Sequence, residues 1–274
     1  MTTVWQKAPP AAFAAVLHLA PLSLLHTGVS RRDWIAFGVL YAVALFALGG
    51  GLHRYFAHRS YRTSRGFQFF LAVLGACFFG DPIGFSGRHR LHHRHSDTAR
   101  DIHDLRRGLW YTWIGRLLED GYPEAEILDA TRDLARYPEL LWLHRRCAWI
   151  GVGAAATVWG LGGYTMFAAG YCLALCLVGI HGASAINFFG HQVRPRRFGT
   201  DDLSSNNAWL GVVMFGEGWH NNHHAYPSAA RSGILWYEID LLYYGLKLLS
   251  WTGLIWDLHE VPDAVRSASP ARAA

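Results

Sequence analysis

Four apolar stretches of nearly membrane-spanning length constrain this chain more than any other feature. They cover residues 11–29, 34–51, 148–167 and 168–189, and a helix needs about 20 apolar residues to cross the hydrocarbon layer of a bilayer. Because the connections within each pair are short, we expect two helical hairpins that each return to their starting side. The sequence therefore predicts an all-α, multi-pass integral membrane protein with four transmembrane helices.

The composition agrees with a membrane protein. Of the 274 residues, 51% are hydrophobic and only 16% are charged, which lies outside the usual range of soluble domains. The 12 Trp and 12 Tyr residues suit the boundary between lipid and water. The formal net charge of +5 comes without a nucleic-acid-binding motif, so membrane lipids are expected partners and nucleic acids are not.

Two further apolar segments are predicted to lie at the membrane surface. Residues 67–85 are interrupted by Gly-Asp-Pro at positions 80–82, which favours a re-entrant or interfacial helix. Residues 234–256 contain three charged side chains and favour an amphipathic surface helix. We expect residues 1–262 to form a single membrane domain, and the Ala/Ser/Arg-rich residues 263–274 to form a disordered tail.

The polar segment 88–146 should lie on the same side of the membrane as the ends of the second and fourth spans. Its arginines favour the cytoplasmic side under the positive-inside rule, although Arg31 and Arg32 in the opposite loop weigh slightly against this orientation. We therefore expect a cytoplasmic helical cap, and any site formed at these span ends should face the cytoplasm.

Histidines gather in three clusters at this side. The clusters read HRYFAH, HRLHH and HNNHH, and the i, i+3, i+4 spacing of the last two places three imidazoles on one face of a helix. The two histidines of HRYFAH are five residues apart and would diverge on a regular α-helix, so we expect the helix to end between them. The clustered residues are His53, His58, His89, His92, His93, His220, His223 and His224.

Eight clustered imidazoles predict a metal site, because ligation requires the neutral form and so removes the repulsion between protonated rings. Eight are too many for one tetrahedral or octahedral ion, which favours two metals. The four cysteines form no CxxC pair, so imidazole and oxygen must hold the metal, and iron, copper or catalytic zinc remain as choices. Hydrolytic two-metal sites usually include bridging carboxylates, and their absence from the clusters favours oxygen chemistry.

The order HxxxxH, HxxHH, HxxHH, together with the two hydrophobic hairpins, resembles the membrane-bound fatty acyl desaturases of the stearoyl-CoA (Δ9) type. The resemblance extends over residues 49–262 and is carried by HRYFAHRSYRTSRGFQFFLAVLG, HRLHHRHSDTARDIHDLRRG and GEGWHNNHHAYPSAAR. The segment INFFGHQVRPRRF adds the family's Asn-x-x-x-His pattern through Asn187 and His191. His181 competes with His191 for this role, but its spacing to the third cluster fits less well.

The resemblance implies an oxidoreductase that uses O2 and a centre of two iron ions to introduce a double bond into an acyl chain. Close variants with the same clusters hydroxylate, epoxidise or form an acetylenic bond. No b5-type haem domain or iron–sulfur cysteine pattern is present, so a separate electron donor is expected, either a ferredoxin or a b5-like protein. The implied metal-binding residues are His53, His58, His89, His92, His93, His191, His220, His223 and His224, with Asn187 reaching the second iron through water.

Polar residues near the clusters are expected to orient the imidazoles or to contact substrate. The candidates for accepting the second N–H of a ligating ring are Asp97, Asp101, Asp202 and Glu217, and His103 is expected beside them or on the substrate side. Acids occupy the position of the family's basic CoA-binding stretch, at residues 119–126, so the acyl carrier can be CoA, a carrier protein or a lipid. The candidate substrate-binding residues are Arg88, Arg194, Arg196 and Arg197.

A different class of function is a histidine-rich membrane protein that binds or transports metal without redox chemistry. Transport predicts ionisable residues in mid-span along a pathway. Here the clusters lie at span ends, and only His18 and His26 are candidates within a span. This distribution favours the enzyme.

Overall fold

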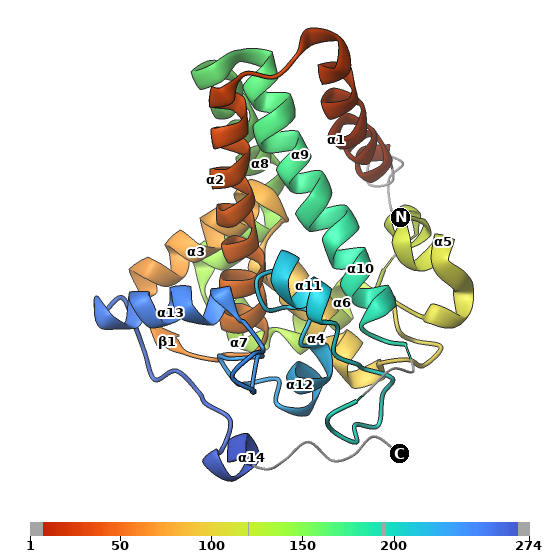
Figure 1. Ribbon diagram of the computed structural model, residues 1–274, viewed down its shortest axis with the longest axis vertical. Helices are drawn as coiled ribbons and strands as arrows, with labels where there is room; N and C mark the ends of the chain where they lie inside the picture. The colour runs from red at the N-terminus through yellow and green to blue at the C-terminus, as the bar shows by residue number, and fades with distance from the viewer. Residues whose placement is uncertain (1–7, 120, 193–195, 268–274) are drawn as a thin grey trace.

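The computed structural model describes residues 8–119, 121–192 and 196–267, and in these ranges the chain is mostly helical (Figure 1). A bundle of long helices rises from a broader body that holds the shorter helices and the C-terminal region. Two helices are long and apolar enough to cross a membrane, Arg31–Ala57 and Pro138–Phe189, and a bent helix pair raises the number to three if it is counted as one span. The prediction of a mostly helical protein with helices of membrane-spanning length is confirmed.

The N-terminal hairpin consists of α1 (Ala8–Thr27), α2 (Arg31–Leu45) and the π-helix η2 (Phe46–Ala57). Gly28 has a φ of +75° and donates its N–H to Leu24 O at 2.8 Å, a left-handed end that glycine adopts without strain. Ser30 and Asp33 then form a capping box at the start of α2. The turn takes up the last two residues of the range 11–29 predicted for the first span, so α1 ends two residues early.

The second hairpin contains α8 (Pro138–Met166), η5 (Phe167–Cys172), α9 (Leu173–Leu175), η6 (Cys176–Gly182) and α10 (Ala183–Phe189). The chain reverses at Gly163, where φ is +70° and ψ is −168°, and the two limbs run antiparallel (Figure 1). The turn lies four residues before the predicted boundary at 167/168, because the left-handed conformation requires glycine. Tyr171 OH donates to Gly151 O across the limbs at 3.4 Å.

The core of the bundle forms where η5 and α9 pack between α1 and α2. Leu17 from α1, Ala44 from α2 and Leu175 from α9 are buried in one cluster. A Cβ at Gly170 would lie 3.2 Å from Leu40 Cδ1, so the small residue lets η5 approach α2 closely. All four cysteines are free, as expected.

A sharp bend separates α3 (Arg65–Phe78) from α4 (Pro82–His95), and their axes differ by 82°. The segment predicted over 67–85 is thus divided between two helices, and the break lies at the interruption seen in the sequence; a bent pair of this kind is a broken span or a re-entrant loop. Gly80 has a φ of +106°, and Asp81 caps the new helix by accepting the N–H of Gly84 at 2.8 Å. The bend redirects the chain so that α4 carries HRLHH into the broad body.

The helix predicted over 234–256 is shorter in the structure, where only α13 (Leu241–Trp251) is helical. Asp240 is fully buried and caps α13, while buried Glu238 accepts the backbone N–H groups of Ile234 and Leu235 at 2.7 and 2.8 Å. Both acids therefore lie before the start of α13 and not on its polar face. On α13, Leu241, Tyr244, Leu248 and Trp251 are exposed.

The remaining elements are short. Two strands, β1 (Arg62–Thr63) and β2 (Ile255–Trp256), pair antiparallel and correct the all-α prediction in a small way. Residues 263–267, expected to be disordered, form α14 (Asp263–Ser267), and residues 268–274 lie outside the described ranges. The other helices are η3 (Leu105–Arg107), α5 (Gly108–Trp113), η4 (Gly115–Leu118), α6 (Glu124–Ala130), α7 (Arg132–Ala135), α11 (Ala208–Val213) and α12 (His220–Ala225).

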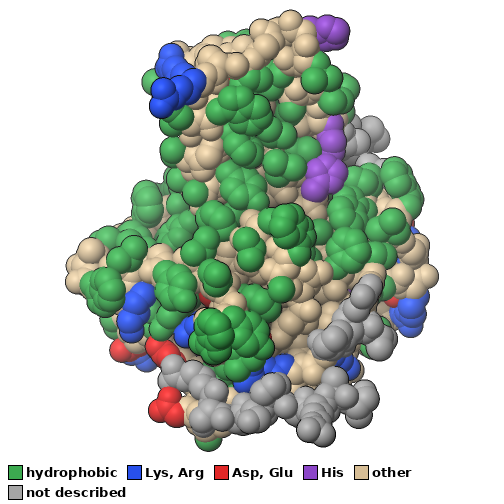
Figure 2. Space-filling model, in the orientation of Figure 1, with side chains coloured by type: hydrophobic (Ala, Val, Ile, Leu, Met, Phe, Trp, Pro, Cys, Tyr) green, Lys and Arg blue, Asp and Glu red, His purple; other side chains and the backbone are tan. Residues whose placement is uncertain are grey.

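Side-chain types separate along the molecule. Figure 2 shows hydrophobic side chains over the visible face of the protruding bundle and most acidic and basic side chains on the broad body. Among the exposed apolar side chains of the bundle, Leu25 is 84% and Trp149 is 74% exposed. Such a surface is unfavourable in water and favourable against lipid.

Candidate metal centre

The first histidine cluster converges because the helix that carries it changes form. η2 is a π-helix through Ala57, and His58 N donates to His53 O at 3.1 Å, an i→i+5 bond that brings residues five apart into register. The two ring centroids are 4.9 Å apart. The expectation that the helix ends between His53 and His58 is therefore wrong, since the helix widens instead.

The other two clusters face each other from α4 and α12. Each supplies three imidazoles at i, i+3, i+4 from one helix face, as the spacing predicts. Together with His53, His58 and His191 they form two groups whose ligand atoms lie within 4.8 Å of one another. The first group contains His53, His58, His89 and His223, and the second contains His92, His191, His220 and His224.

In the first group the Nε2 atoms point at one another. The Nε2–Nε2 distance is 3.1 Å from His53 to His223 and 2.7 Å from His58 to His89. His93 joins from the edge, with its Nε2 3.0 Å from those of His89 and His223. A metal–nitrogen bond of about 2.1 Å would place ligands at right angles about 3.0 Å apart, so this spacing suits imidazoles around an ion.

The second group has the same geometry. The Nε2 of His220 lies 2.9 Å from that of His191 and 3.1 Å from that of His224. The Nε2 of His92 is buried and has no hydrogen-bond partner. A buried nitrogen without a partner is costly, and a cation in the group would satisfy it.

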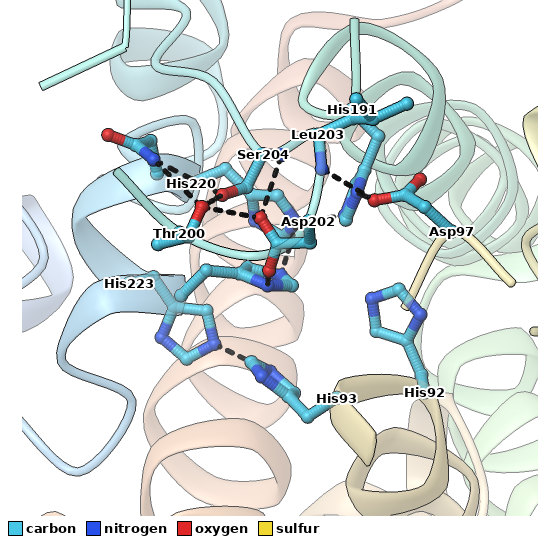
Figure 3. A network of polar contacts seen from close by, with 12 residues as sticks. His92, His93, Asp97, His191, Thr200, Asp202, Leu203, Ser204, His220 and His223 are labelled. Atoms are coloured by element: carbon cyan, nitrogen blue, oxygen red, sulfur yellow. Dashed lines mark hydrogen bonds and ion pairs between the residues drawn. The ribbon is translucent and has the colours of Figure 1, made fainter. Parts of the chain in front are cut away.

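All four predicted acids contact the outer nitrogen of a clustered histidine. Oxygens of these carboxylates lie 2.5 to 3.0 Å from Nδ1, and Figure 3 shows Asp97 and Asp202 beside the second group. The pairs are His53 with Glu217, His92 with Asp101, His191 with Asp97, and His224 with Asp202.

In His92, His191 and His224 these contacts are hydrogen bonds that fix the tautomer of the ring, whereas Nδ1 of His53 lies close to Glu217 without hydrogen-bond geometry. A carboxylate accepts the proton on Nδ1, so Nε2 carries a lone pair directed into the group. In the second group both His191 and His224 are held in this way, and their unprotonated Nε2 atoms converge on His220. Lone pairs that face one another repel unless a cation lies between them, so the residues fit a metal.

Burial keeps the rings neutral. Desolvation lowers the pKa of His220 and His223 well below the usual value, and that of His224 to about 4. Contact with His224 lowers the pKa of Asp202 far below its usual range despite the opposing effect of burial. Neutral imidazole beside ionised carboxylate is the state that binds a metal ion.

Sequence reasoning missed a buried arginine that supports this arrangement. Arg54 is 2% exposed and bonds to Glu217 and Asp240, both at 3.0 Å. Burial raises the pKa of Glu217, but His53 and Arg54 outweigh it and lower the value to about 2. Its position within the first cluster, directly after His53 and the apolar run 34–51, was the available signal.

The glycines of the GEGWH segment permit the close approach that positions Glu217. A Cβ at Gly216 would lie 2.3 Å from Asp240 Oδ1, and one at Gly218 would lie 2.1 Å from the backbone nitrogen of Gly211. Gly216 also has a φ of +119°. Any other residue at these two positions would push the loop away from the arginine network.

The remaining polar candidates lie around the centre. Asn187 Nδ2 contacts His103 Nδ1 at 3.2 Å, and the His103 ring lies 5.0 Å from that of His92. His181, the competitor of His191, belongs to a separate group with His18 and Cys176. The structure thus brings His191, and not His181, to the clustered histidines.

The candidate substrate arginines are more dispersed. Arg88 is exposed on α4 and forms no ion pair with the residues that the structure describes. Arg196 Nη2 donates to Thr200 O at 2.6 Å, and the backbone N–H of Arg197 donates to Asn221 Oδ1 at 2.8 Å. Arg194 lies outside the described residues.

Comparison with known proteins identifies the family. The model of the family described as fatty acid desaturase matches residues 32–249. The chain belongs to the fatty acid desaturase family. It is therefore an oxidoreductase that acts on acyl chains, as the sequence resemblance implies.

Relatives of this desaturase-family chain cover most of its length. It is 36% identical over 233 residues to an sn-1 stearoyl-lipid 9-desaturase of Anabaena variabilis, spanning 82% of this chain and 84% of the relative. It is 34% identical over 234 residues to an sn-2 palmitoyl-lipid 9-desaturase of Nostoc sp. (strain 36), with 81% of each covered. An acyl-CoA C20 Delta5-desaturase of Anemone leveillei is 31% identical over 256 residues, spanning 92% of this chain and 81% of the relative.

Proposed function

We propose that this protein is an O2-dependent acyl desaturase that forms a double bond at the Δ9 position with two iron ions. The observation that carries the proposal is the convergence of nine imidazoles into two adjacent groups in a chain of this family. The proposed ligands are His53, His58, His89, His93 and His223 for one ion and His92, His191, His220 and His224 for the other, with Asn187 reaching the second ion through water.

Bound iron would supply O2 activation and the oxidising power to remove two hydrogens from adjacent methylenes, with release of water. Reduction of O2 to two waters takes four electrons, of which the acyl chain provides two. A separate donor, a ferredoxin or a b5-like protein, provides the other two. Burial lowers the pKa of six of the nine rings and so favours their neutral form, at His58, His89, His93, His220, His223 and His224. The carboxylates of Asp97, Asp101, Asp202 and Glu217 contact the outer nitrogens of four rings.

The proposed membrane arrangement has four spans, formed by α1, α2 with η2, α8, and η5 through α10. The apolar surface of the bundle and the reversal at Gly163 support two hairpins. The histidine groups lie on the broad body at the base of the bundle, which we propose faces the cytoplasm as a helical cap. The short helices α3 and α13 would lie at the interface.

The relatives guide the choice of substrate. Two of them are named as lipid 9-desaturases and one as an acyl-CoA desaturase. A lipid-linked stearoyl or palmitoyl chain is therefore the first substrate to test, followed by acyl-CoA and acyl carrier protein. Arg196 and Arg197 are proposed to contact the carrier or the lipid head groups at the membrane surface.

Expression in a desaturase-deficient host that supplies ferredoxin or b5 tests this proposal. The wild-type chain should add Δ9 monounsaturated acids to the lipids, and His92→Ala should abolish them. His26→Ala removes an exposed imidazole at the far end of α1 and should leave the product unchanged. A hydroxylated or acetylenic product would assign a related activity, and an unchanged acyl profile with two irons bound per chain would refute acyl oxidation in that host.

A further inference from the structure

The end of η2, which carries the first histidine cluster, is held by an arginine from the second cluster. Arg90 follows His89 on α4. Its Nη2 donates to Phe56 O at 2.7 Å and its Nε to Ala57 O at 2.9 Å. Carbonyl groups at the C-terminal end of a helix lack N–H donors from a following turn, and a cation there satisfies them and interacts favourably with the helix dipole. Arg90 therefore closes η2 at the residue that precedes His58.

The guanidinium of Arg90 is fixed in turn by α7 and by the end of α6. Asp133 accepts from Nη1 at 2.6 Å and from Nη2 at 3.2 Å, and Ala130 O accepts from Nη1 at 2.9 Å. The side chains of Arg90 and Asp133 are only 19% and 24% exposed. Burial raises the pKa of Asp133, but hydrogen bonds from Arg90 and Arg59 outweigh it and lower the value. A largely buried arginine with five hydrogen bonds has one defined position.

The residue after His58 is bound to the same carboxylate. Arg59 pairs with Asp133, and its backbone N–H donates to Tyr55 O at 3.0 Å. Its φ of +56° is a left-handed conformation that is uncommon for residues other than glycine. Asp133 thus holds the chain on both sides of His58, through Arg90 at residues 56–57 and directly at Arg59.

Close packing of α4 against α6 brings these groups together. A Cβ at Gly87 would lie 2.6 Å from Ile127 Cγ2 and 3.0 Å from Ile127 O, so the two helices are in close contact about one turn before Arg90. His89, the neighbour of Arg90, places its Nε2 2.7 Å from that of His58. Two adjacent residues of α4 therefore act on the same helix end: one faces His58 and the other fixes the residues before it.

We infer that Arg90, fixed by Asp133, is a positioning residue for the first histidine group: it holds the end of η2 so that His58 keeps its place in the group. The inference rests on the proposed two-metal function. Asp202 orients His224 by a direct hydrogen bond to the ring, whereas Arg90 acts on His58 through the backbone of the helix end. Metal ligands must be held to within about 0.5 Å, so loss of Arg90 should weaken the ion of the first group and spare the other.

Retention of Co2+ by the full-length protein in an uncharged detergent tests the inference without O2, acyl chain or electron donor. The wild-type protein should hold two ions per chain against a graded chelator. In Arg90→Gln one ion should bind about tenfold more weakly, as expected when a group that orients a ligand is removed, and the other should stay within about twofold. The visible absorption of bound Co2+ should also change at saturating metal, because a displaced ligand alters the coordination geometry.

Two further variants separate the charge of Arg90 from its hydrogen bonds. Arg90→Lys should restore part of the affinity, because an ammonium keeps the charge but lacks the planar fork that bonds the carbonyls and the carboxylate together. Asp133→Asn should weaken the same ion by less than Arg90→Gln does, because Arg90 keeps its bonds to η2. These two variants supply the same comparison if Arg90→Gln does not fold.

Arg132→Gln is the matched control, because Arg132 is next to Asp133 in sequence, is 81% exposed and pairs with Asp129 on the surface. This variant should hold both ions as tightly as wild type. Equal weakening of both ions in Arg90→Gln would overturn the inference. A lower unfolding temperature with unchanged affinity and an unchanged Co2+ spectrum would also overturn it, since Arg90 would then only stabilise the fold.

A double variant tests the assignment to the first group. Asp202 contacts His224 in the second group, so Asp202→Asn should weaken the other ion. In the variant that combines Arg90→Gln with Asp202→Asn, each ion should bind as weakly as in the corresponding single variant. A loss confined to one ion in the double variant would place both residues at the same group and refute the assignment.

The outcome is separate from that of the proposed function. A loss of one Co2+ ion in Arg90→Gln, in a protein that oxidises no acyl chain, would leave the positioning role standing and remove the desaturase. Unchanged Co2+ binding by Arg90→Gln, in a protein that is an active desaturase, would do the reverse.

Discussion

Replacing Asp202 by Asn should weaken metal binding by turning one imidazole the wrong way. Oδ1 of Asp202 accepts from Thr200 Oγ1 at 2.7 Å and from the Ser204 backbone N–H at 2.9 Å, while Oδ2 lies 2.6 Å from His224 Nδ1. The new amide keeps the first two bonds only if its oxygen stays in place, and its NH2 then faces the ring. His224 must accept at Nδ1 and carry its proton on Nε2, the atom that points into the second group.

The structure also limits the alternative rotamer of the amide in the Asp202→Asn variant. A flip would restore the acceptor at the ring but leave the Ser204 N–H without one, which costs about 1–3 kcal/mol. Either route should lower metal affinity by about 10- to 100-fold, or about 1.4–2.7 kcal/mol. The free energy of unfolding of the metal-free protein should change by less than about 1 kcal/mol if the amide oxygen keeps its hydrogen bonds to Thr200 and Ser204.

Metal retained per chain after equilibration with a graded chelator measures this effect, and thermal unfolding of the metal-free protein measures stability. Asp129→Asn is the matched control, since Asp129 is 55% exposed and pairs with Arg132 on the surface. If Asp202→Asn holds metal within about twofold of wild type, the idea that the carboxylate fixes the tautomer is wrong. A large loss of metal-free stability would show that Asp202 supports the loop instead.

Three other perturbations test separate parts of the structure. Glu217→Gln should destabilise the metal-free protein by about 1–3 kcal/mol in denaturant unfolding, because buried Arg54 loses one of its carboxylates; a stability equal to wild type would contradict this. Burial lowers the pKa of His224 to about 4, so the unfolded chain takes up this proton first and metal-free stability should fall as the pH drops from about 6.5 to 4; a series of thermal melts that shows no such fall would refute it. Gly218→Ala should lower stability by about 1–3 kcal/mol through overpacking against α11, whereas Gly199→Ala, with open space around it, should not.

Hydrophobic length alone located the long helices, because burying or exposing about 20 apolar residues in sequence dominates every local preference. The local backbone conformation, which depends on hydrogen-bond geometry, could not be predicted from hydrophobic length. The π-helix η2 and the reversal at Gly163 each follow from local backbone form, which periodicity does not encode. The helix predicted over 234–256 is too long for a different reason. Glu238 and Asp240 look like the polar face of a helix, but both are buried before α13, where Asp240 is the N-cap and Glu238 accepts from the backbone of the preceding turn.

The site was more predictable than the fold around it. Spacing of three and four residues puts imidazoles on one helix face wherever the helix goes. The four acids were found because they lie near the clusters in sequence, but Asp97 contacts His191 and Glu217 contacts His53, pairings that the sequence does not specify. The ion pair between Arg54 and Asp240 was not predicted, because the two residues are 186 positions apart in sequence and only the tertiary fold brings them together. Partners that close a network over long sequence distance leave no local pattern in a single chain.

The ion pairs of Arg54 with Glu217 and Asp240 show how the loop that carries Glu217 can orient a histidine on another element. His53 on η2 is oriented by Glu217, which follows the close-packed Gly216, and Glu217 is held in turn by Arg54 from η2 itself. η2 thus carries both His53 and Arg54, and Arg54 holds the carboxylate of Glu217 that contacts His53. Asp240 anchors that cation and starts α13, so a shift of α13 would be transmitted to His53 through two buried ion pairs. The orientation of His53 is therefore coupled to the position of α13, and not only to the helix on which His53 lies.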